Sequence, residues 1–348
     1  MARRLRVLHL PFNMASVMHN NVVAQRAIGL DARGYILEEH SSIVDSSGLS
    51  LIPRLPSVAR YAWLARKFMW ADIVHWYWWE TVLPRGRDLG LLRRLGKPCV
   101  VEWMGSDIRD HQLELVENPF YRRLWQEDAD FRDQCQRMCQ SYGAQERFMH
   151  VGAWSLAHPG MVQYLIPAAR THSRVVMRGL DISKISLPRD RVQCDPPIVV
   201  HAPSRRAGKG TRYVLEAVDR LRAQGGVFEF RLIEGLEHGQ ALAEIAKADV
   251  FVDQMIVGDY GVASIEAMAM GVPTICFVKD SIVPRYPAEP PIVNATIDSL
   301  PTVLGNLLAD RGRRHSLGLR SREYVERHHD IKEVANSMKA IYTSVIGK

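Results

Sequence analysis

The sequence has no run of apolar residues that approaches the roughly 18 needed for a membrane-spanning helix. Its 24 glycines show no three-residue period, which excludes a collagen-like chain. The basic first residues are not followed by the ~7–15 apolar residues of a secretory leader, so we read Arg6–Leu10 as a first strand. With 47% hydrophobic and 24% charged residues, the 348-residue chain is also not disordered. A cytoplasmic protein of two domains is expected.

Cysteine is scarce and scattered, with five residues and no C-x-x-C pair. An odd count without a secretory leader predicts reduced thiols. The pair four residues apart has no histidine pair at zinc spacing nearby, so we expect no metal there. The five are Cys99, Cys135, Cys139, Cys194 and Cys276.

Lysine is also scarce, because only 9 of the 45 basic residues are lysine and the rest are arginine. Arginine suits bidentate recognition of phosphate or carboxylate. The net charge of +7 is compatible with nucleotide ligands, an anionic membrane surface or nucleic acid, and it does not choose among them. No signature of a nucleic-acid-binding module is present. No G-x-G-x-x-G follows any predicted strand, which disfavours a dinucleotide oxidoreductase.

Short apolar runs alternate with longer amphipathic ones along the whole chain. This alternation predicts an α/β protein with doubly wound parallel sheets. The proline-bearing stretch Asp181–Pro197 separates two blocks, so we expect domains at 1–183 and 184–328, followed by a last helix within 329–348. The predicted strands are Arg6–Leu10, Asp72–Trp76, Pro98–Trp103, Phe148–Val151, Arg174–Met177, Ile198–His201, Phe228–Ile233, Val250–Asp253 and Thr274–Val278. The predicted helices are Val17–Leu30, Pro84–Leu95, Pro119–Gln140, Thr211–Gln224, Gln240–Lys247, Val262–Met270, Leu300–Ala309 and Glu333–Ile346.

Two loops of the second block carry the features of an anion site. In the segment Ile198–Thr211, an apolar strand runs into a basic, glycine-bearing loop and then into a helix. In Ala248–Pro273, a strand is followed by a loop with two glycines and a helix that carries Glu266. Backbone N–H groups at a helix start favour a negative group, and Glu266 could accept hydrogen bonds from sugar hydroxyls. We expect the two helix starts, near Thr211 and Val262, to converge on one pyrophosphate site.

These two segments resemble the C-terminal domain of GT-B glycosyltransferases of family four, which are retaining and depend on nucleotide sugars. The residues that carry the resemblance are Lys209–Gly210, Ala248–Val252 and the run from Glu266 to Pro273 (EAMAMGVP). Weaker similarity covers the first half at Val100–Asp107 and Arg178–Asp181. The resemblance implies two Rossmann-like domains that face a cleft, and a last helix within 329–348 that crosses back to the first domain.

The sequence departs from the family pattern at four places. Gly258 stands where the family has the first Glu of its Glu-x7-Glu motif, and Asp259 is the candidate substitute. Ser204 stands at the family's diphosphate-binding Arg, so a neighbouring arginine would have to replace it. Met104 replaces a frequent His, and the first loop lacks the usual glycine pair. A second hypothesis is therefore a catalytically silent relative that binds a nucleotide, a glycan or a partner protein.

The resemblance implies transfer of a sugar from a UDP or GDP sugar to a glycan, lipid-linked or small-molecule hydroxyl, with no metal and no other cofactor. Two carboxylates that flank the bond would not be required. The implied donor-binding residues are Ser204, Arg205, Arg206, Lys209, Glu234, Tyr260, Gly261, Val262 and Glu266. The implied acceptor-binding residues are Asn13, Asn20, Gly105, Ser106, Arg109 and Trp78. The implied catalytic residues are Asp107, Asp259 and His19.

Three weaker sequence signals each allow two interpretations. Asp128-Ala129-Asp130 matches an Asp-x-Asp metal motif, but residues two apart in a helix do not share a face, so no metal is expected there. The aromatic run after His75 serves core packing or stacks on an acceptor. The segment Ile52–Trp70 mixes basic and aromatic residues at helical spacing. It is either a surface helix packed on the first domain or an interfacial helix that contacts anionic lipid.

Overall fold

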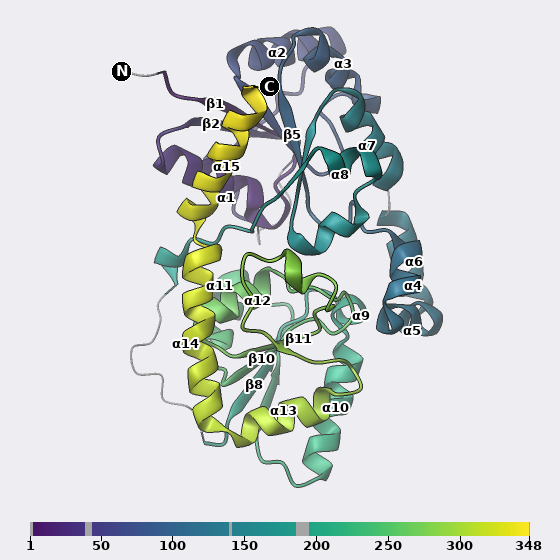
Figure 1. Ribbon diagram of the computed structural model, residues 1–348, viewed down its shortest axis with the longest axis vertical. Coiled ribbons are helices and arrows are strands. Elements are labelled where there is room, and N and C mark those ends of the chain that lie inside the picture. The colour runs from purple at the N-terminus through teal and green to yellow at the C-terminus, as the bar shows by residue number, and fades with distance from the viewer. Residues whose placement is uncertain (1–2, 39–43, 139–140, 186–194, 348) are drawn as a thin grey trace. The chain divides into compact units, whose positions relative to one another are not determined.

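The chain forms two compact units, seen in the computed structural model of Figure 1, which describes residues 3–38, 44–138, 141–185 and 195–347. Unit 1 contains residues 1–110, 138–179 and 331–348, and unit 2 contains residues 111–137 and 180–330. The expected division placed 111–137 in the first domain, and the structure corrects this because that segment packs into the core of unit 2. Cys139 and Cys194 lie outside the described residues.

Unit 1 is built on a seven-stranded sheet in the order β3-β2-β1-β4-β5-β6-β7, in which every pair is parallel. Its central strands are buried throughout, as expected for a parallel sheet with both faces covered. The strands are β1 (Arg6–Leu10), β2 (Asp31–Ile36), β3 (Ser50–Leu51), β4 (Ile73–Tyr77), β5 (Cys99–Trp103), β6 (Trp154–Ala157) and β7 (Ser173–Val175).

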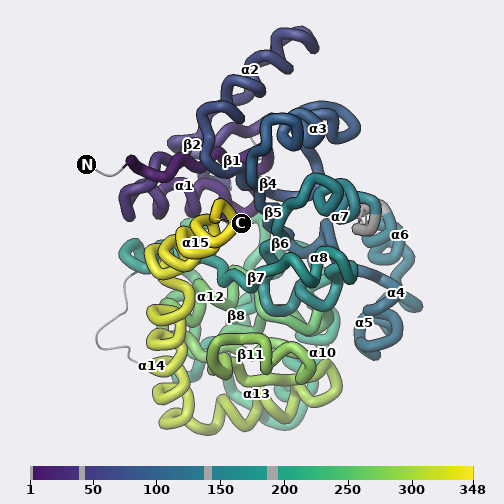
Figure 2. Tube along the Cα trace, turned by 45° about the horizontal axis from the view of Figure 1, so that its top comes forward, coloured from purple at the N-terminus to yellow at the C-terminus, as the bar shows by residue number. Residues whose placement is uncertain are grey.

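Helices cover this sheet, and the last helix of the chain is one of them. α15 (Ile331–Ile346) lies along α1 (Val17–Ala27), as both views in Figures 1 and 2 show. The return of the C-terminal helix to the first sheet is thus confirmed. The other helices of unit 1 are α2 (Ser57–Trp70), α3 (Arg87–Arg94), α7 (Ser141–His150) and α8 (Pro167–Thr171), with 3-10 turns η1 (Met14–Ser16), η2 (Pro84–Gly86) and η3 (Pro159–Tyr164).

A buried polar network joins α15 and α1 to the first sheet. His9 lies beside His75 in the register of β1 and β4, and Tyr77 lies beside Glu102 in the register of β4 and β5. Burial lowers the pKa of His9 and that of His75, the latter to about 3, so both rings are neutral. The bonds are His9 Nε2 to Gln25 Oε1 at 3.0 Å, Gln25 Nε2 to Tyr342 Oη at 3.0 Å, Tyr342 Oη to His75 Nδ1 at 2.7 Å, and Asn21 Nδ2 to Tyr77 Oη at 2.9 Å and Glu102 Oε2 at 3.1 Å.

Unit 2 is built on a five-stranded parallel sheet in the order β12-β11-β10-β8-β9. Its strands are β8 (Ile198–His201), β9 (Glu229–Leu232), β10 (Val250–Val252), β11 (Thr274–Cys276) and β12 (Val293–Asn294). Its helices are α9 (Arg206–Lys209), α10 (Thr211–Ala223), α11 (His238–Ile245), α12 (Val262–Ala269), α13 (Leu300–Ala309) and α14 (Arg311–His328), with η4 (Ile182–Lys184) and η5 (Val283–Arg285).

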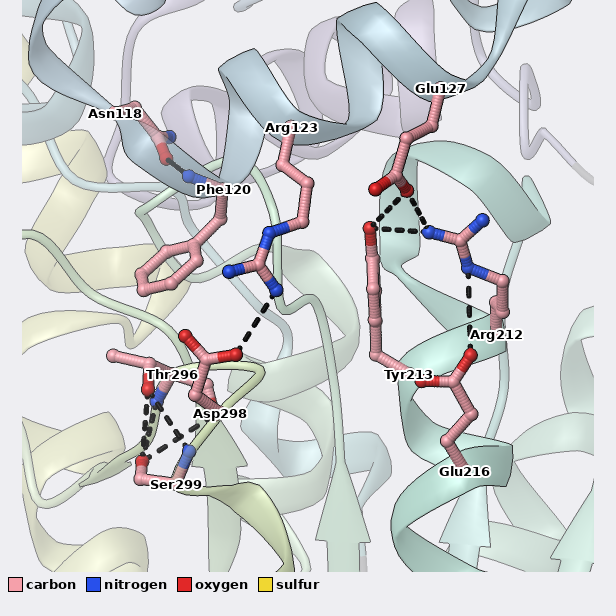
Figure 3. Close-up of polar contacts among 10 residues, drawn as sticks. All are labelled: Asn118, Phe120, Arg123, Glu127, Arg212, Tyr213, Glu216, Thr296, Asp298 and Ser299. Atoms are coloured by element: carbon pink, nitrogen blue, oxygen red, sulfur yellow. Dashed lines mark hydrogen bonds and ion pairs between the residues drawn. The ribbon is translucent and has the colours of Figure 1, made fainter.

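Three helices that follow β5 in sequence belong to unit 2. They are α4 (His111–Glu117), α5 (Pro119–Glu127) and α6 (Ala129–Met138), the last through residue 137. Tyr121, Leu124 and Phe131 are buried in one hydrophobic cluster with residues of β8, α10 and α13. Figure 3 shows the polar edge of this contact, where Arg123 lies 3.0 Å from Asp298 and Glu127 meets Arg212.

Several predicted elements are wrong in type or extent. The predicted strand Phe148–Val151 is wrong, because its first three residues are the end of α7 and Val151 lies in the turn that follows, while β6 begins at Trp154. A short apolar run does not distinguish a buried helix end from a buried strand. The predicted helix Pro119–Gln140 is broken between α5 and α6, where the Asp128 side chain accepts a bond from Phe131 N at 2.8 Å and caps α6. The sequence interpretation also missed α14 and β2.

Candidate functional site

The loops that follow β8 and β10 meet at the carboxyl edge of the second sheet. Met255 N donates to Lys209 O at 3.1 Å, which ties one loop to the other. Gly210 has φ +75°, and a Cβ there would lie 3.1 Å from Met255 Cβ and from Ile256 Cγ1. Glycine at 210 therefore allows both the left-handed turn and the close approach. The two loops are therefore in contact, whereas a pyrophosphate site shared by the two helix starts stays a prediction.

Lys209 brings a cation to the start of α12. Its Nζ lies 3.7 Å from the position that a Cβ on Gly261 would take, and it contacts the carboxylate of Asp253. The Lys209 side chain is 14% exposed, whereas that of Asp253 is 1% exposed and also accepts from Ser264 Oγ at 2.5 Å. Burial alone would raise the pKa of Asp253, but the Lys209 ammonium and the Ser264 bond lower it below its ordinary value. An ammonium has three donors, so Lys209 can hold Asp253 and a further anion.

His201 fixes the base of this site. Burial lowers the pKa of His201, so its ring is neutral. Nδ1 lies 2.8 Å from Val252 O, which can only accept, so Nδ1 carries the proton. Nε2 then accepts from Thr211 Oγ1 at 2.9 Å. The ring thus joins the end of β10 to the first residue of α10.

The first turn of α12 opens to the surface beside Lys209. Gly261, Val262 and Ala263 are partly exposed, and the first bond within the helix runs from Ile265 N to Gly261 O at 3.2 Å. The N–H groups of the preceding residues have no acceptor inside the helix, as at every helix start. Together with Lys209, they form a place for an anion.

Glu266 lies in the second turn of α12 and is held by a histidine that the sequence interpretation did not single out. His238 Nε2, at the start of α11, lies 2.7 Å from Glu266 Oε1. This bond raises the pKa of His238 above its ordinary value. The Glu266 side chain is 8% exposed and that of His238 is 51% exposed. Glu266 retains acceptor capacity, since a carboxylate accepts about four hydrogen bonds.

Two predicted donor-binding residues pair with each other. Arg206 Nε lies 2.8 Å and its Nη2 2.5 Å from the two oxygens of Glu234, in a bidentate pair. This bond raises the pKa of Arg206 and lowers that of Glu234. Ser204 and Arg205 are exposed in the same loop.

Position 258 has no room for the carboxylate that the family pattern would place there. Gly258 has φ +77°, and a Cβ there would lie 2.6 Å from Lys279 Cγ. Lys279 is itself buried, and its Nζ lies 2.6 Å from Glu114 Oε1 of α4. A Glu at 258 would therefore need both a strained backbone and a displaced lysine.

Asp259 and Tyr260 face the interior of unit 2. Asp259 is 4% exposed and accepts from Tyr260 N at 2.8 Å and from the Tyr286 hydroxyl. Tyr260 is 1% exposed, stacks on Tyr286 at 5.0 Å and lies 3.1 Å from His329 Nε2 through its hydroxyl. Internal bonds hold both side chains, so these contacts do not support donor contact by Tyr260 or the substitution of Asp259 for the family's first Glu, and both stay predictions.

Asn118, at the junction of α4 and α5, holds the loop that precedes α12. Asn118, which is fully buried, donates through Nδ2 to Ile256 O at 2.8 Å and to Glu114 Oε2 at 2.9 Å. Lys279 N donates to Gly258 O at 3.0 Å. A pair of buried polar residues on α4 and its junction with α5 thus fixes the loop that carries Gly261.

In unit 1, the predicted residues of the first loop serve the loop itself. Asn13 is 1% exposed and accepts from His19 N at 3.1 Å, while its Nδ2 donates to Asp45 O at 2.8 Å. His19 is 5% exposed, with Nδ1 2.6 Å from Ser47 O and Nε2 3.2 Å from Asp45 Oδ2. Both nitrogens of His19 are therefore engaged, which does not support a catalytic role for it. Asn20 is partly exposed on α1.

The loop after β5 is likewise closed by an internal bond. Asp107 is fully buried, and its Oδ1 accepts from Gly105 N at 2.7 Å and from Met104 N at 3.1 Å. Burial raises the pKa of Asp107 to about 6, while these backbone bonds oppose the rise. Asp107 is thus placed as the residue that closes the turn, and the catalytic role expected of it lacks geometric support. Ser106 and Arg109 are partly exposed.

The aromatic run after His75 divides between core and surface. Trp76 and Tyr77 are fully buried, whereas Trp78 and Trp79 are partly exposed. Trp78 has φ +71°, a left-handed conformation that is uncommon for a bulky residue, and it turns the chain at the end of β4. Two of these aromatic residues therefore belong to the core and two are accessible at the surface. Contact of Trp78 with an acceptor stays a prediction.

Among the described residues, no group of three or more His, Cys, Asp or Glu side chains could hold a metal ion. Within the same residues, no helix is both long and apolar enough to cross a membrane.

Comparison with known proteins identifies the fold. The sequence matches no protein-family model and no curated protein sequence. The structure is similar to sucrose-phosphate synthase from Thermosynechococcus elongatus, with 15% identity over 99% of this chain and 100% of that chain and a TM-score of 0.59. Anabaena HepE in complex with UDP-glucose gives 11% identity over 98% and 100% of the chains and a TM-score of 0.62. WaaG, a glycosyltransferase involved in lipopolysaccharide biosynthesis, gives 14% identity over 97% and 100% and a TM-score of 0.53. With its two parallel α/β sheets and this likeness over nearly the whole length, the chain has the GT-B fold of these glycosyltransferases.

Proposed function

We propose that the chain is a glycosyltransferase that moves a sugar from a nucleoside diphosphate sugar to a hydroxyl acceptor. The observation that carries the proposal is the placement of the Lys209 ammonium beside the exposed start of α12, with Glu266 in the next turn. In this proposal a diphosphate contacts both the Lys209 ammonium and the N–H groups of the helix start, and Glu266 accepts hydrogen bonds from the ribose hydroxyls. HepE was solved in complex with UDP-glucose and with UDP, which is in keeping with such a donor.

The proposed chemistry is charge stabilisation and positioning. The bond between the sugar C1 and the diphosphate oxygen breaks, and the acceptor oxygen bonds to C1 on the same face of the sugar, which retains its configuration. The proton of the acceptor passes to the leaving diphosphate. Lys209 and the α12 N–H groups stabilise the charge that develops on the diphosphate, in a site that is organised before the donor binds. We assign the acceptor to the surface formed by α1 and by the loops after β4 and β5. The residues assigned there are Asn20, Trp78, Ser106 and Arg109.

Calorimetry of the full chain with UDP-glucose and GDP-mannose tests the donor site. Glu266→Gln keeps the shape of the side chain but removes its charge, so we expect the affinity to fall by about tenfold or more. Glu216→Gln, an exposed carboxylate on α10, is the matched control and should leave affinity unchanged. If wild type binds neither compound, or if both variants behave alike, the donor site is assigned wrongly.

A second candidate, binding without transfer, is favoured by the lysine that fills the space at Gly258. Release of nucleoside diphosphate from a bound donor, measured over a panel of acceptors with and without EDTA, separates the two. Transfer that survives EDTA and gives a product of the donor's anomeric configuration supports the retaining, metal-independent reaction. Tight donor binding with no release over the panel supports the silent relative.

A further inference from the structure

Helix α2 is held to unit 1 along one side only. Leu64 and Phe68 are its fully buried residues, and Phe68 packs edge-on to Trp76 at 6.2 Å. Trp63 packs edge-on to Tyr35 at 5.2 Å. Much of the helix projects away from the strands of unit 1 in Figure 2.

The opposite side of α2 carries an exposed apolar stripe. Val58, Ala62 and Met69 lie at i, i+4 and i+11 and so share one stripe of the helix surface. Val58 is 84% exposed and Met69 is 55% exposed, with Tyr61 at the margin at 36%. Four of the eleven large apolar residues that are exposed in the described part of the chain fall between 51 and 69. An apolar stripe on a solvent-facing helix marks an interaction surface.

The charge around the stripe is of one sign. No acidic residue occurs between Asp45 and Asp72, a stretch that contains Arg54, Arg60, Arg66 and Lys67. Residues 46–97 hold nine basic and three acidic residues, a surplus of six in a chain whose net charge is +7. One of the three, Asp88, is fully buried, and another, Asp72, pairs with Arg3 and Arg6. α3 packs beside α2 and adds exposed Arg87, Arg93 and Arg94.

We propose that α2 docks on an anionic phospholipid bilayer, with the Val58–Met69 stripe among the acyl chains and the flanking arginines at the headgroups. Lys67 lies on the packed side of α2, over the rings of Tyr35 and Trp63, so the cation beside the stripe on this helix is the exposed Arg66. An apolar stripe with basic residues beside it is the composition of helices that lie in the membrane interface. Anionic lipid attracts basic groups close to its surface, which supplies the complementary charge. The proposal does not depend on the donor site, because it concerns a helix of unit 1.

Co-sedimentation of the full chain with vesicles tests the proposal, using phosphatidylcholine alone and a mixture with about one-third phosphatidylglycerol. Wild type should sediment with the mixed vesicles and not with phosphatidylcholine alone, and high salt should weaken the binding. Val58→Asp combined with Met69→Asp should reduce the bound fraction at least about tenfold. The matched control is Val116→Asp combined with Val227→Asp, at positions 75% and 78% exposed in unit 2, and it should bind as wild type does.

Equal vesicle binding by the two double variants would overturn the proposal. It would also be overturned if wild type bound both kinds of vesicle equally well or bound neither kind. A dimer in analytical ultracentrifugation that the Val58/Met69 variant dissociates would assign the stripe to a second copy of the chain and also overturn it. Thermal unfolding checks that both variants fold, and unchanged UDP-glucose affinity would keep this test separate from that of the donor site.

Discussion

Each of the two units has polar side chains packed near its parallel sheet, but their surroundings differ between the units. In unit 1, the polar residues His9, His75 and Glu102 lie on β1, β4 and β5. They bond to side chains of α1 and α15 and form a buried network with them. In unit 2, Lys209 pairs with buried Asp253 and Glu266 pairs with half-exposed His238, close to the exposed start of α12. A polar group whose hydrogen bonds are all made inside the protein stabilises the fold. A polar group that can still make hydrogen bonds at the surface can bind a ligand.

This distinction predicts the largest stability effect for a buried polar contact behind the donor loop. Glu114→Ala removes the carboxylate that buried Lys279 and Asn118 contact, so we expect a loss of about 3–5 kcal/mol in the free energy of unfolding, measured in urea. Glu127→Ala, at the exposed end of the same helical insertion, should cost less than about 1 kcal/mol. Similar losses of unfolding free energy in the two variants would show that burial does not make the Glu114 contacts more important than the Glu127 contact.

A second, intermediate effect should appear in unit 1 as a pH dependence. Burial raises the pKa of Glu102 to about 7, above the ordinary value of about 4.3 for an unfolded chain. The folded state therefore binds more protons between these values, and its stability falls as the pH rises through them. Wild type should lose on the order of 2 kcal/mol between about pH 5 and pH 8 that Glu102→Gln does not lose.

His9 and His75 titrate in the same network, with lowered pKa values that change stability in the opposite direction, so the difference between wild type and Glu102→Gln is the informative quantity. Glu216→Gln, at an exposed site, is the control and should follow wild type at every pH. Parallel curves for wild type and Glu102→Gln would mean that the carboxyl is not held protonated by burial.

The smallest effect should come from the half-exposed pair at the donor site. The raised pKa of His238 means that its bond to Glu266 contributes fully below about pH 6.5 and is lost as the pH rises through the raised value. Because the ring is half exposed, solvent screens the pair, and His238→Gln should cost less than about 1 kcal/mol at pH 6 and less still at pH 9. His315→Gln, an exposed histidine of α14, should show no such trend. A cost that grows with pH would contradict the assigned pair.

The sequence predicted the second unit better than the first, for reasons that particular residues show. Lys209, Gly261 and Glu266 lie in two short motifs just after strand ends, and the resemblance of both motifs to one family pattern predicted a shared site. The network of His9, His75 and Glu102 depends on the register of three strands and on a helix more than 300 residues from β1, as the bond from Gln25 to Tyr342 shows. Polar residues within otherwise apolar strands were the available signal for it. His238 and Lys279 could not be found locally, because their partners lie in other elements.

The insertion of α4, α5 and α6 into unit 2 has a practical consequence for dissecting the protein. A cut in the stretch between the two halves of the sequence would leave Tyr121, Leu124 and Phe131 on the wrong fragment and strip the second sheet of part of its packing. The same cut would separate α15 from the sheet that it covers. Independent expression of either half should therefore give insoluble material, whereas co-expression of both halves should restore a folded complex.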